Sequence, residues 1–486
     1  MKVSISYSSV AATLGRLLVV EALLLLVPLV TDLCTGARAW AGFAVAAAVA
    51  GALGGAAALL PRGPHLRIGR HEGFLLVSLA WFVFSAVGMI PFMMMGEESL
   101  SLSDAFFETV SGFTTTGATT IADVEALGRG TLLWRAMTQW IGGLGIILFM
   151  LAVLPSLNER GGIPIFNAEV TGITHDKLQP RIRQTAAELW KIYILLTVVL
   201  VLLLWAGPMS LFDAVCQSFA ALSTGGFSTR NDGIAWWGSS YVAVVLTVFM
   251  FLGGINFTLL RPALHGRLRP LLRNDVVRLY ALITGAAFLG TSIPLLIHGG
   301  PLKDSIVAPL FHVVSAITTT GFSLADFSAW GAFGILITYM LMLSGACAGS
   351  TSGALKTDRL LALARLARNE TQRSVYPKRV LLVRVNGHVL PSQELTRTAA
   401  FTVIYLSLTV LGAFVLTLWG ISIDDAFFAV LSCIGNNGLG YGLTGAEGGY
   451  HLLPDELKWF LAVLMIAGRL ELYSVMVLFA RSFWLK

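Results

Sequence analysis

The chain has 486 residues, of which 56% are hydrophobic and 12% are charged, and its formal net charge at pH 7 is +6. A soluble domain carries about twice that share of charged residues. Several apolar runs reach the length of about 18 residues that indicates a membrane-spanning helix. The composition therefore excludes an ordinary soluble domain and predicts an all-α polytopic membrane protein.

The positive charge is concentrated in four segments, residues 62–70, 160–183, 261–278 and 356–397. These segments follow alternate apolar runs, so the positive-inside rule places them in the cytoplasm together with both termini. The opposite loops are acidic or neutral and would concentrate cations modestly at a pore mouth. Ordinary solvated loops would explain each of those charges singly. The location of the basic residues accounts for the net charge without a nucleic-acid partner.

Two leading spans are expected at residues 14–33 and 39–60, within a first segment of residues 1–70. Four units of one plan follow, at residues 71–160, 161–270, 271–395 and 396–486. Each unit has a span, a short helix, a Gly-containing stretch and a second span. The expected spans are 73–95, 131–154, 186–205, 240–260, 276–297, one that starts near 331, 396–419 and 457–483. This plan predicts ten spans and four re-entrant helices.

The Gly-containing stretch recurs at intervals of roughly a hundred residues, which is typical of a repeat architecture. Its four copies are Thr114-Thr115-Thr116-Gly117-Ala118, Leu222-Ser223-Thr224-Gly225-Gly226, Thr318-Thr319-Thr320-Gly321-Phe322 and Gly435-Asn436-Asn437-Gly438-Leu439. One copy alone would indicate a re-entrant turn with a structural role. Four copies in the same place within four units favour a shared function.

A short helix precedes each stretch, at residues 103–113, 211–222, 305–317 and 424–434. We expect Ser103 or Asp104, Asp213, Asp304 and Asp424 to cap these helices. A helix of about 10–12 residues crosses only about half of the hydrocarbon layer. The chain must then return through irregular backbone, which a membrane protein tolerates only where it is buried or lines a water-filled cavity. Four such returns are expected to face one another around an axis.

A dehydrated monovalent cation needs oxygen ligands that replace its hydration shell, and rings of backbone carbonyls supply them in potassium filters. Turning carbonyl groups inward requires backbone angles that favour glycine. The C-termini of the short helices would direct partial negative charge at the same place, which favours a cation. The four stretches could therefore form within one chain the ring that a tetrameric channel builds from four.

With these motifs the chain resembles the Trk/Ktr potassium transporters, and the TrkH-type branch in particular, over nearly its whole length. Further matches are Pro180-Arg181-Ile182, Ala346-Cys347-Ala348-Gly349-Ser350-Thr351 and Gly468-Arg469-Leu470-Glu471-Leu472. The resemblance implies a selectivity filter made by Thr115, Thr116, Gly117, Ser223, Thr224, Gly225, Thr319, Thr320, Gly321, Asn436, Asn437 and Gly438. Related eukaryotic proteins with serine in the first loop admit sodium, so Gly117 points to potassium.

A run rich in Gly, Ser and Thr, residues 344–353, interrupts the second span of the third unit and does not favour a firm helix. Close helix packing is the alternative explanation of its glycines. The resemblance implies an intramembrane loop that obstructs conduction. Its gate residues would be Gly345, Gly349, Ser350, Thr351 and Gly353, together with Arg469. Family members usually carry more glycine after the Ser-Thr pair, where this chain has Ser352 and Ala354.

Arg469 lies in an otherwise apolar span, where an arginine costs about 2.5–3.5 kcal/mol on insertion scales, so it should face an interior or a partner. Glu471 follows two residues later, roughly on the opposite side of a helix, and is a poor partner. A structural ion pair or a snorkelling side chain is the alternative. The resemblance implies a positive barrier in the pore.

The basic segment 356–397 is expected to contact anionic lipid and to form a hairpin at Asn386-Gly387. The resemblance implies a homodimer in the inner membrane of a bacterium. It also implies a cytosolic nucleotide-binding regulatory subunit of the regulator-of-potassium-conductance (RCK) type, similar to TrkA. No cofactor is expected in this chain, and K⁺ is the transported ion.

Two alternatives to potassium conduction remain at this stage. A symporter that moves potassium with sodium or protons is disfavoured because no acidic residue lies convincingly in the middle of a span. An integral membrane enzyme would need a carboxylate pair or a metal cluster at the cytoplasmic interface, and the sequence suggests none. Nucleotide-binding loops and nucleophile elbows are also missing from the sequence.

Overall fold

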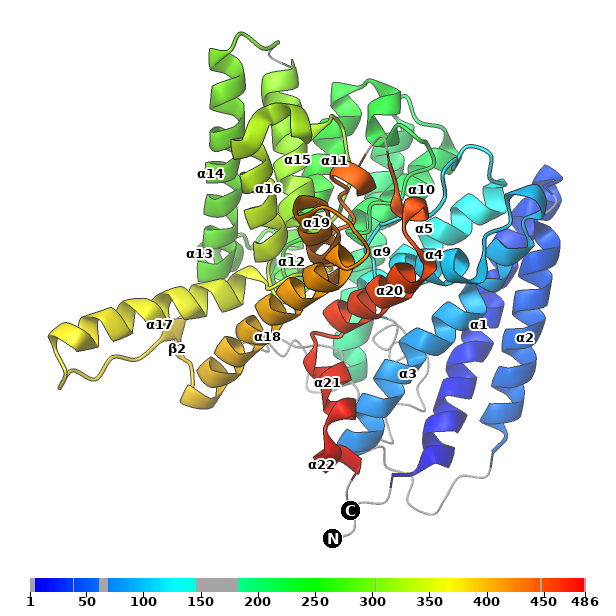
Figure 1. Cartoon of the computed structure of the whole chain (residues 1–486), viewed down its shortest axis with the longest axis horizontal. Coiled ribbons are helices and arrows are strands. Elements are labelled where there is room, and N and C mark those ends of the chain that lie inside the picture. Colours follow the sequence, from blue (N-terminus) through cyan, green and yellow to red (C-terminus); the bar gives the residue numbers. More distant parts are fainter. Residues whose placement is uncertain are drawn as a thin grey trace.

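A computed structural model describes residues 5–37, 39–60, 69–145, 182–301, 303–445 and 448–484, and these are almost entirely helical (Figure 1). Several sequence predictions fall outside the described residues. They are the second half of the span 131–154, most of the basic segments 62–70 and 160–183, and the Pro180-Arg181 pair.

The first two helices, α1 (Tyr7–Thr35) and α2 (Trp40–Ala58), form an antiparallel pair at one side of the molecule (Figure 1). Their backbones approach closely because Gly15 of α1 faces Gly54 of α2. Small residues at such crossings allow close helix packing in membranes. α1 also packs on α3 (Arg70–Gly88) and α5 (Arg129–Gly143), where the backbone N–H of Gly130 donates to Asp32 at 2.6 Å.

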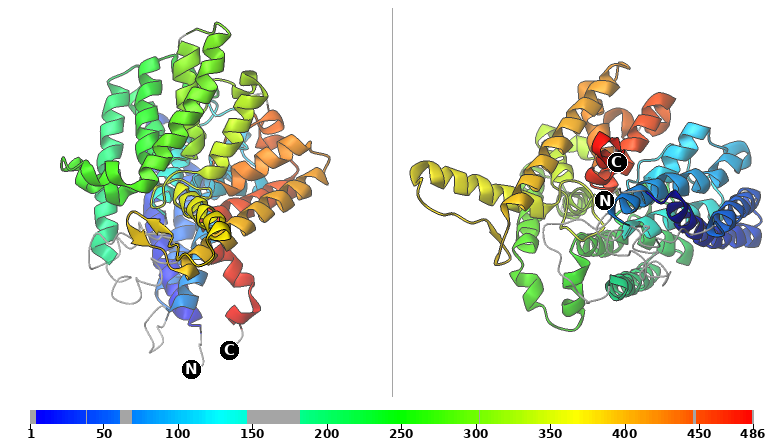
Figure 2. Two further views of the ribbon diagram at one scale, coloured as in Figure 1. Left: turned by 90° about the vertical axis from the view of Figure 1, so that its left-hand side faces the viewer. Right: turned by 90° about the horizontal axis from the view of Figure 1, so that it is seen from below.

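Four units follow, and seen from below they surround the centre in chain order (Figure 2). The first contains α3, the 3₁₀ turns η1 (Ile90–Met94) and η2 (Gly96–Glu98), α4 (Leu102–Phe113) and α5. The second contains α9 (Ile182–Trp205), α10 (Leu211–Leu222), η3 (Gly233–Trp237), α11 (Ser240–Gly253), α12 (Phe257–Leu264) and α13 (Arg269–Arg273). The third contains α14 (Asp275–Ile297), the π turn η4 (Lys303–Val307), α15 (Ala308–Ile317), η5 (Phe327–Trp330), α16 (Gly331–Ser344), α17 (Thr357–Val375), β1 (Arg384–Val385) and β2 (His388–Val389). The fourth contains α18 (Ser392–Thr417), α19 (Ile423–Ile434), η6 (Gly442–Thr444), η7 (Tyr450–Leu452), α20 (Asp455–Arg469), α21 (Tyr473–Phe479) and α22 (Arg481–Trp484).

Seven helices among the described residues are long and apolar enough to cross a membrane, and two bent pairs raise the number to nine. The expected spans 240–260 and 457–483 are each bent at a break, since α11 and α12 meet at 113° and α20 and α21 at 115°. The first break follows from Asn256, whose side chain caps α12. The second follows from Glu471 and Leu472, whose positive φ angles cannot continue a helix. The tenth expected span, 131–154, is described only to residue 145.

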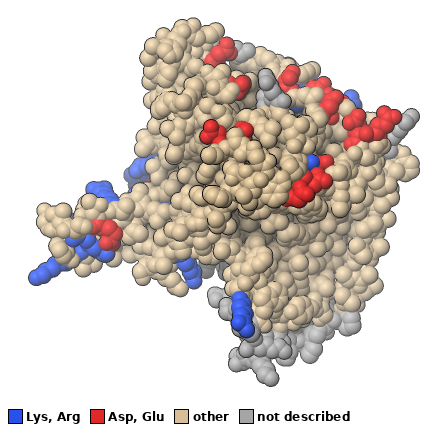
Figure 3. Space-filling view, viewed as in Figure 1, with Lys and Arg blue, Asp and Glu red and all other residues tan. Residues whose placement is uncertain are grey.

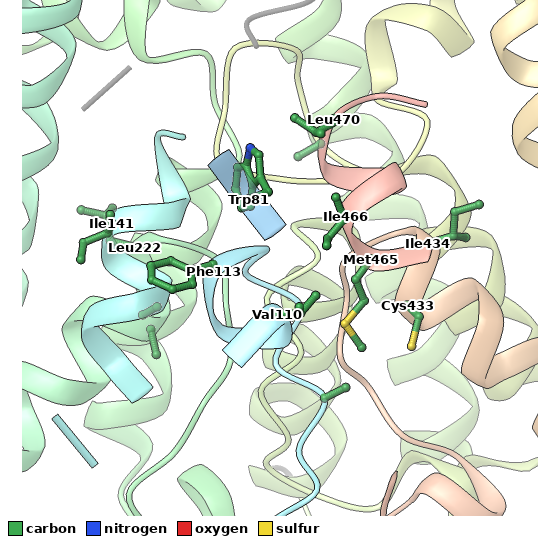
Figure 4. Packing of buried hydrophobic residues seen from close by; sticks show 14 of the residues in the cluster. Trp81, Val110, Phe113, Ile141, Leu222, Cys433, Ile434, Met465, Ile466 and Leu470 are labelled. Atoms are coloured by element: carbon green, nitrogen blue, oxygen red, sulfur yellow. The ribbon is translucent and has the colours of Figure 1, made fainter. Parts of the chain in front are cut away.

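The four short helices α4, α10, α15 and α19 lie inside the protein. All residues of α4 from Ser103 to Phe113 are buried apart from Asp104. Figure 4 shows Val110 of α4 near Met465 of α20 and Phe113 of α4 towards Leu222 of α10, within the central apolar core. Burial of these helices satisfies the requirement that the irregular backbone after them be kept from lipid.

Three of these helices have serine caps that sequence analysis missed. The hydroxyl groups of Ser101, Ser210 and Ser422 accept from the backbone N–H groups of Asp104, Asp213 and Asp425 at 3.1–3.2 Å. The same hydroxyl groups donate to the three aspartate side chains at 2.7–2.8 Å. The aspartates therefore complete a reciprocal cap three residues into the helix. Asp304 does not cap α15, which instead continues from the π turn with Pro309 in its first turn.

The helix α17 and the hairpin β1–β2 extend from the body (Figure 1). The strands pair antiparallel, with Val385 opposite His388. Asn386 and Gly387 both have positive φ, as a type I′ turn requires, so the expected hairpin is confirmed.

Charge is segregated along the molecule. On the face drawn in Figure 3, most acidic side chains lie towards the end that is uppermost in the view, and most basic ones lie on the α17 extension and near α22. The start of α1 and the end of α22 lie together at the lower end (Figure 1). This arrangement agrees with the charge alternation seen in the sequence.

The crossing of α1 and α2 generates a stability prediction. A methyl group at Gly54 would lie 2.7 Å from the Gly15 carbonyl oxygen, whereas one at the adjacent Gly55 meets nothing within 4 Å. Gly54→Ala should lower the unfolding free energy by about 1–3 kcal/mol through overpacking, and Gly55→Ala should raise it slightly through helix propensity. Thermal unfolding of the detergent-solubilised variants measures both, and equal melting temperatures would contradict the close approach.

Candidate functional site

The four stretches adopt the same backbone conformation and are called loops one to four (residues 114–118, 223–227, 318–322 and 435–439). A non-glycine residue with positive φ opens each turn: Thr115 at 55°, Thr224 at 55°, Thr319 at 56° and Asn436 at 51°. A glycine with positive φ follows two residues later: Gly117 at 85°, Gly226 at 80°, Gly321 at 81° and Gly438 at 76°. Four copies of so unusual a conformation show that the loops are structurally equivalent.

This equivalence corrects the glycine that was assigned to the turn of loop two. Sequence analysis assigned Gly225 as the partner of Gly117, Gly321 and Gly438, but Gly226 has their backbone conformation. Gly225 instead corresponds to Thr116, Thr320 and Asn437. Loop two has two adjacent glycines, and only the positive φ reveals which of them occupies the turn.

The loops close into a ring in chain order. A Cβ atom at Gly117 would overlap the carbonyl oxygen of Gly225, and one at Gly226 would overlap that of Thr320. The same holds for Gly321 against Asn437 and for Gly438 against Thr116, which returns to loop one. Each glycine is therefore required by the carbonyl group of the next loop. We call this arrangement the loop ring.

Each short helix ends in the ring with the same hydrogen bonds. The N–H groups of Thr116, Gly225, Thr320 and Asn437 donate to carbonyls five residues earlier, at 2.8–2.9 Å. This is the pattern of a helix C-terminus closed by a left-handed residue. Left-handed threonine costs roughly 1–3 kcal/mol and persists only where the surroundings impose it. The helix ends therefore direct partial negative charge at the ring.

Side chains of the ring are buried and mutually bonded. The hydroxyl groups of Thr114 and Thr116 lie 2.8 Å apart, and those of Thr318 and Thr320 lie 2.7 Å apart. In loop four, the amide of Asn437 donates to the Ala316 carbonyl at 2.7 Å. Within the described residues there is no group of three or more His, Cys, Asp or Glu side chains that could hold a metal ion. The arrangement offers backbone and hydroxyl oxygens, which suit a weakly held monovalent cation.

A buried ion pair lies behind loops one and two. Arg135 of α5 contacts Glu108 of α4 at 2.8 Å, with 2% and 0% of the two side chains exposed. Arg135 also donates to the carbonyl of Ser228 at 3.0 Å, and Glu108 accepts from the N–H of Thr120 at 2.9 Å. The pair therefore links the outer ends of the two loops. Sequence analysis missed it, although charged residues inside apolar runs are the expected signal.

The outer loops that follow loops one and two are joined by Asn231, whose amide donates to Asp123 at 2.8 Å. That bond, with the backbone N–H of Glu125, holds the pKa of the Asp123 carboxyl below its usual range. Asp123 therefore remains ionised at neutral pH. Arg230 reaches Glu125 at 3.5 Å, so part of the acidic charge of this face is balanced.

The expected intramembrane loop lies directly against the loop ring. α16 ends at Ser344, and Gly345 and Gly349 have positive φ, so the predicted interruption is confirmed. The Thr351 hydroxyl donates to the carbonyl of Leu222, at the end of α10, at 3.2 Å. The N–H of Gly353 donates to the Thr319 hydroxyl of loop three at 2.9 Å. Gly353 also lies so close to the Gly435 carbonyl that no Cβ would fit there.

Arg469, the last residue of α20, joins this intramembrane loop to the first unit. Its guanidinium group donates to the Thr351 carbonyl at 2.7 Å and to the Gly142 and Gly143 carbonyls of α5 at 2.6 Å. The positive charge thus lies at the C-terminus of α5, where the helix dipole favours it. Arg469 braces the loop in this structure. Ser350, the remaining predicted gate residue, is half-buried and donates to the Cys347 carbonyl within the loop.

Glu471 has cationic partners that sequence analysis did not identify. It contacts Lys356 at 2.8 Å and Arg359 of α17 more closely still. Lys356, Glu471 and Leu472 all have positive φ, so these residues lie where regular helix is interrupted. Because Lys356 follows the intramembrane loop and Glu471 lies at the break between α20 and α21, the ion pairs connect these two places.

Comparison with known proteins shows which family has this architecture. The family model TrkH, described as a cation transport protein, matches residues 42–275 and 295–485. The chain belongs to the TrkH family of cation transport proteins. It is 35% identical over 417 residues to the Trk system potassium uptake protein TrkH of Escherichia coli (strain K12), covering 85% of this chain and 86% of that protein. It is 34% identical over 477 residues to the protein of the same name from Halomonas elongata, covering 97% and 98%.

A solved structure shows the same fold. The crystal structure of the potassium transporter TrkH from Vibrio parahaemolyticus matches with a TM-score of 0.89 and 30% sequence identity, over 99% of this chain and 100% of that one. The fold expected from the sequence, a helical polytopic membrane protein, is thereby confirmed. Membership of a transporter family also argues against a membrane enzyme.

The ion pairs of Glu471 generate a second stability prediction. Glu471→Gln would leave Lys356 and Arg359 without their carboxylate, although their side chains are only 12% and 9% exposed. Removing one member of a buried ion pair costs about 3–5 kcal/mol. Thermal unfolding should show a large loss of stability.

A matched control uses an exposed pair in the same region. Glu370 contacts Arg373 with side chains 53% and 47% exposed, so Glu370→Gln should cost about 0–1 kcal/mol. The buried pair would be energetically unimportant if the two variants melted at the same temperature.

Proposed function

We propose that this chain takes up potassium across the cytoplasmic membrane of a bacterium by conducting K⁺ through the loop ring, which acts as its selectivity filter. The closed ring of loop carbonyls and glycines is the observation that carries this proposal. Its oxygen ligands carry no formal charge, as a filter that must release its ion requires. Its relatives are named potassium uptake proteins, which supports the choice of ion.

The intramembrane loop and Arg469 would gate this pathway. Hydrogen bonds of Thr351 and Gly353 hold the loop against loop three and the end of α10, and Arg469 ties it to α5. Opening would require these bonds to exchange partners. The ion pairs of Glu471 would transmit movement between α17 and the loop.

The electrochemical gradient would suffice to drive uptake. A membrane potential contributes about 2.3 kcal/mol per charge for each 100 mV. Since about 1.4 kcal/mol corresponds to a factor of ten, 100 mV supports roughly fifty-fold accumulation. A pump is therefore unnecessary.

The assembly we propose is a homodimer with a cytosolic nucleotide-binding subunit of the RCK type, similar to TrkA. The basic helix α17 and its hairpin extend sideways from the body, below the acidic end, where such a partner or anionic lipid would bind (Figures 1 and 3). Both termini would be cytoplasmic under the positive-inside rule.

Ion flux into proteoliposomes tests the filter. The wild type should admit K⁺ and Rb⁺ in preference to Na⁺ and Li⁺. Gly117→Ser should abolish that preference, because its side chain would overlap the carbonyl of Gly225. Gly55→Ala, whose methyl group meets nothing, is the control. An unchanged preference in Gly117→Ser would refute the filter.

The gate is tested by Arg469→Ala in the same assay. Loss of the bonds to Thr351, Gly142 and Gly143 should raise K⁺ flux severalfold with unchanged selectivity. This variant also separates a closed gate from a wrong function if the wild type conducts nothing. Flux equal to that of the wild type would show that Arg469 does not restrain the pathway.

Glu21 of α1 favours one alternative, transport coupled to protons. Sequence analysis found no acidic residue convincingly within a span, yet Glu21 is fully buried there and neither of its carboxyl oxygens has a hydrogen-bond partner. Intramembrane carboxyl groups are functional candidates. A reversal potential that depends on pH in the wild type, but not in Glu21→Gln, would support coupling. A reversal potential set by the K⁺ gradient alone would support a channel.

A further inference from the structure

Loop two lacks the side chains that brace the other loops. It has Gly225 where loops one, three and four have Thr116, Thr320 and Asn437. Its helix has Ala220 at the place of Ser111, Ser315 and Ser432, and the last two of these serines bond the carbonyls of Phe322 and Leu439 at 2.8–2.9 Å. Loop two therefore needs a brace from elsewhere.

Gln139 of α5 occupies the vacant space. Its side-chain amide donates to the Gly225 carbonyl at 2.7 Å, and its amide oxygen accepts from the Phe227 N–H at 3.1 Å. The side chain is fully buried, and its Cδ lies 2.5 Å from where a Cβ of residue 225 would be. One side-chain amide thus forms hydrogen bonds with the backbone on both sides of Gly226.

The corresponding residues of two other units are apolar. Gly142, Gly253 and Gly468 each approach the carbonyl of the last residue of a short helix, respectively Phe113, Leu222 and Ile434. These glycines therefore mark equivalent positions. Three residues before them lie Gln139, Met250 and Met465, so the polar side chain is found in the unit that faces loop two.

We propose that Gln139 is a positioning residue for ion selectivity, which replaces the missing side chain of loop two and sets the direction of the Gly225 carbonyl. That carbonyl packs against Gly117 of loop one, as the equivalent carbonyls pack against their neighbouring glycines. The inference rests on the proposed filter function. Arg135, one turn earlier on α5, supports the same loop through the Ser228 carbonyl and the Phe227 ring.

The test measures ion binding without requiring an open gate. An ion that binds the folded protein raises its melting temperature in proportion to the logarithm of its concentration. Melting of the detergent-solubilised full chain is recorded across K⁺ and Na⁺ titrations, and the ratio of their apparent affinities is obtained. Proteoliposome flux provides a second readout.

Gln139→Leu removes both hydrogen bonds and should reduce the ratio of K⁺ to Na⁺ affinity roughly tenfold or more. Gln139→Glu keeps the shape but turns an acceptor towards the Gly225 carbonyl, so it should reduce the ratio as well. Met137→Leu, a volume-conserving change on the same helix, is the matched control and should keep the wild-type ratio.

A compensating pair of substitutions separates positioning from folding. Gly225→Thr alone should be disruptive, because its Cβ overlaps Gln139. Gln139→Ala with Gly225→Thr recreates the pattern of loops one and three, in which residue 225 could bond Ser223. The double variant should recover K⁺ selectivity relative to either single variant, as a double-mutant cycle will show.

The outcomes distinguish the two proposals. Selectivity lost in Gly117→Ser but kept in Gln139→Leu and Gln139→Glu would overturn the role of Gln139 and leave the filter intact. Selectivity kept in all three would overturn the filter itself. A double variant as unselective as Gln139→Ala would show that the side chain of residue 225 does not replace the amide.

Discussion

The contact between a glycine and the carbonyl group of the neighbouring loop is the constraint on which the rest of this structure depends. It is repeated four times and closes on itself, from loop one through loop four and back to Gly117. No side chain fits at these positions, and the preceding Thr or Asn residues are held in left-handed conformations. Such strain persists only where the surroundings impose it. The short helices, their serine caps and the apolar core supply those surroundings.

The loop ring is supported by apolar packing of the core and by polar side chains that contact the loops. Apolar residues of α4 and α20 pack together, as Figure 4 shows, and they exclude water from the helix ends. The Glu108–Arg135 pair and Gln139 reach from the first unit onto loop two. The loops are therefore similar in backbone but unequal in support, since loop two depends on side chains of α5.

The inner side of the ring is asymmetric as well. The intramembrane loop belongs to the third unit, Arg469 belongs to the fourth, and their bonds reach the second and first units. The four similar units thus form the loop ring. The elements in which the units differ, the intramembrane loop and Arg469, restrain that ring. Glu471 extends this connection to Lys356 and to α17, which carries four arginines and extends from the body.

The sequence by itself determined the class of protein, the places of the short helices, the four loop motifs, the interruption after Ser344 and the hairpin at Asn386-Gly387. Each of these follows from local properties, because apolar length, glycine and turn residues act within a few positions of the chain. The tertiary structure alone decided that Gly226, and not Gly225, occupies the turn of loop two. It also decided the partners of Glu471 and the contacts of Gln139 and Arg469. These depend on groups roughly 86 to 327 residues apart in the chain, such as Gln139 with Gly225 and Arg469 with Gly142, which no local pattern encodes.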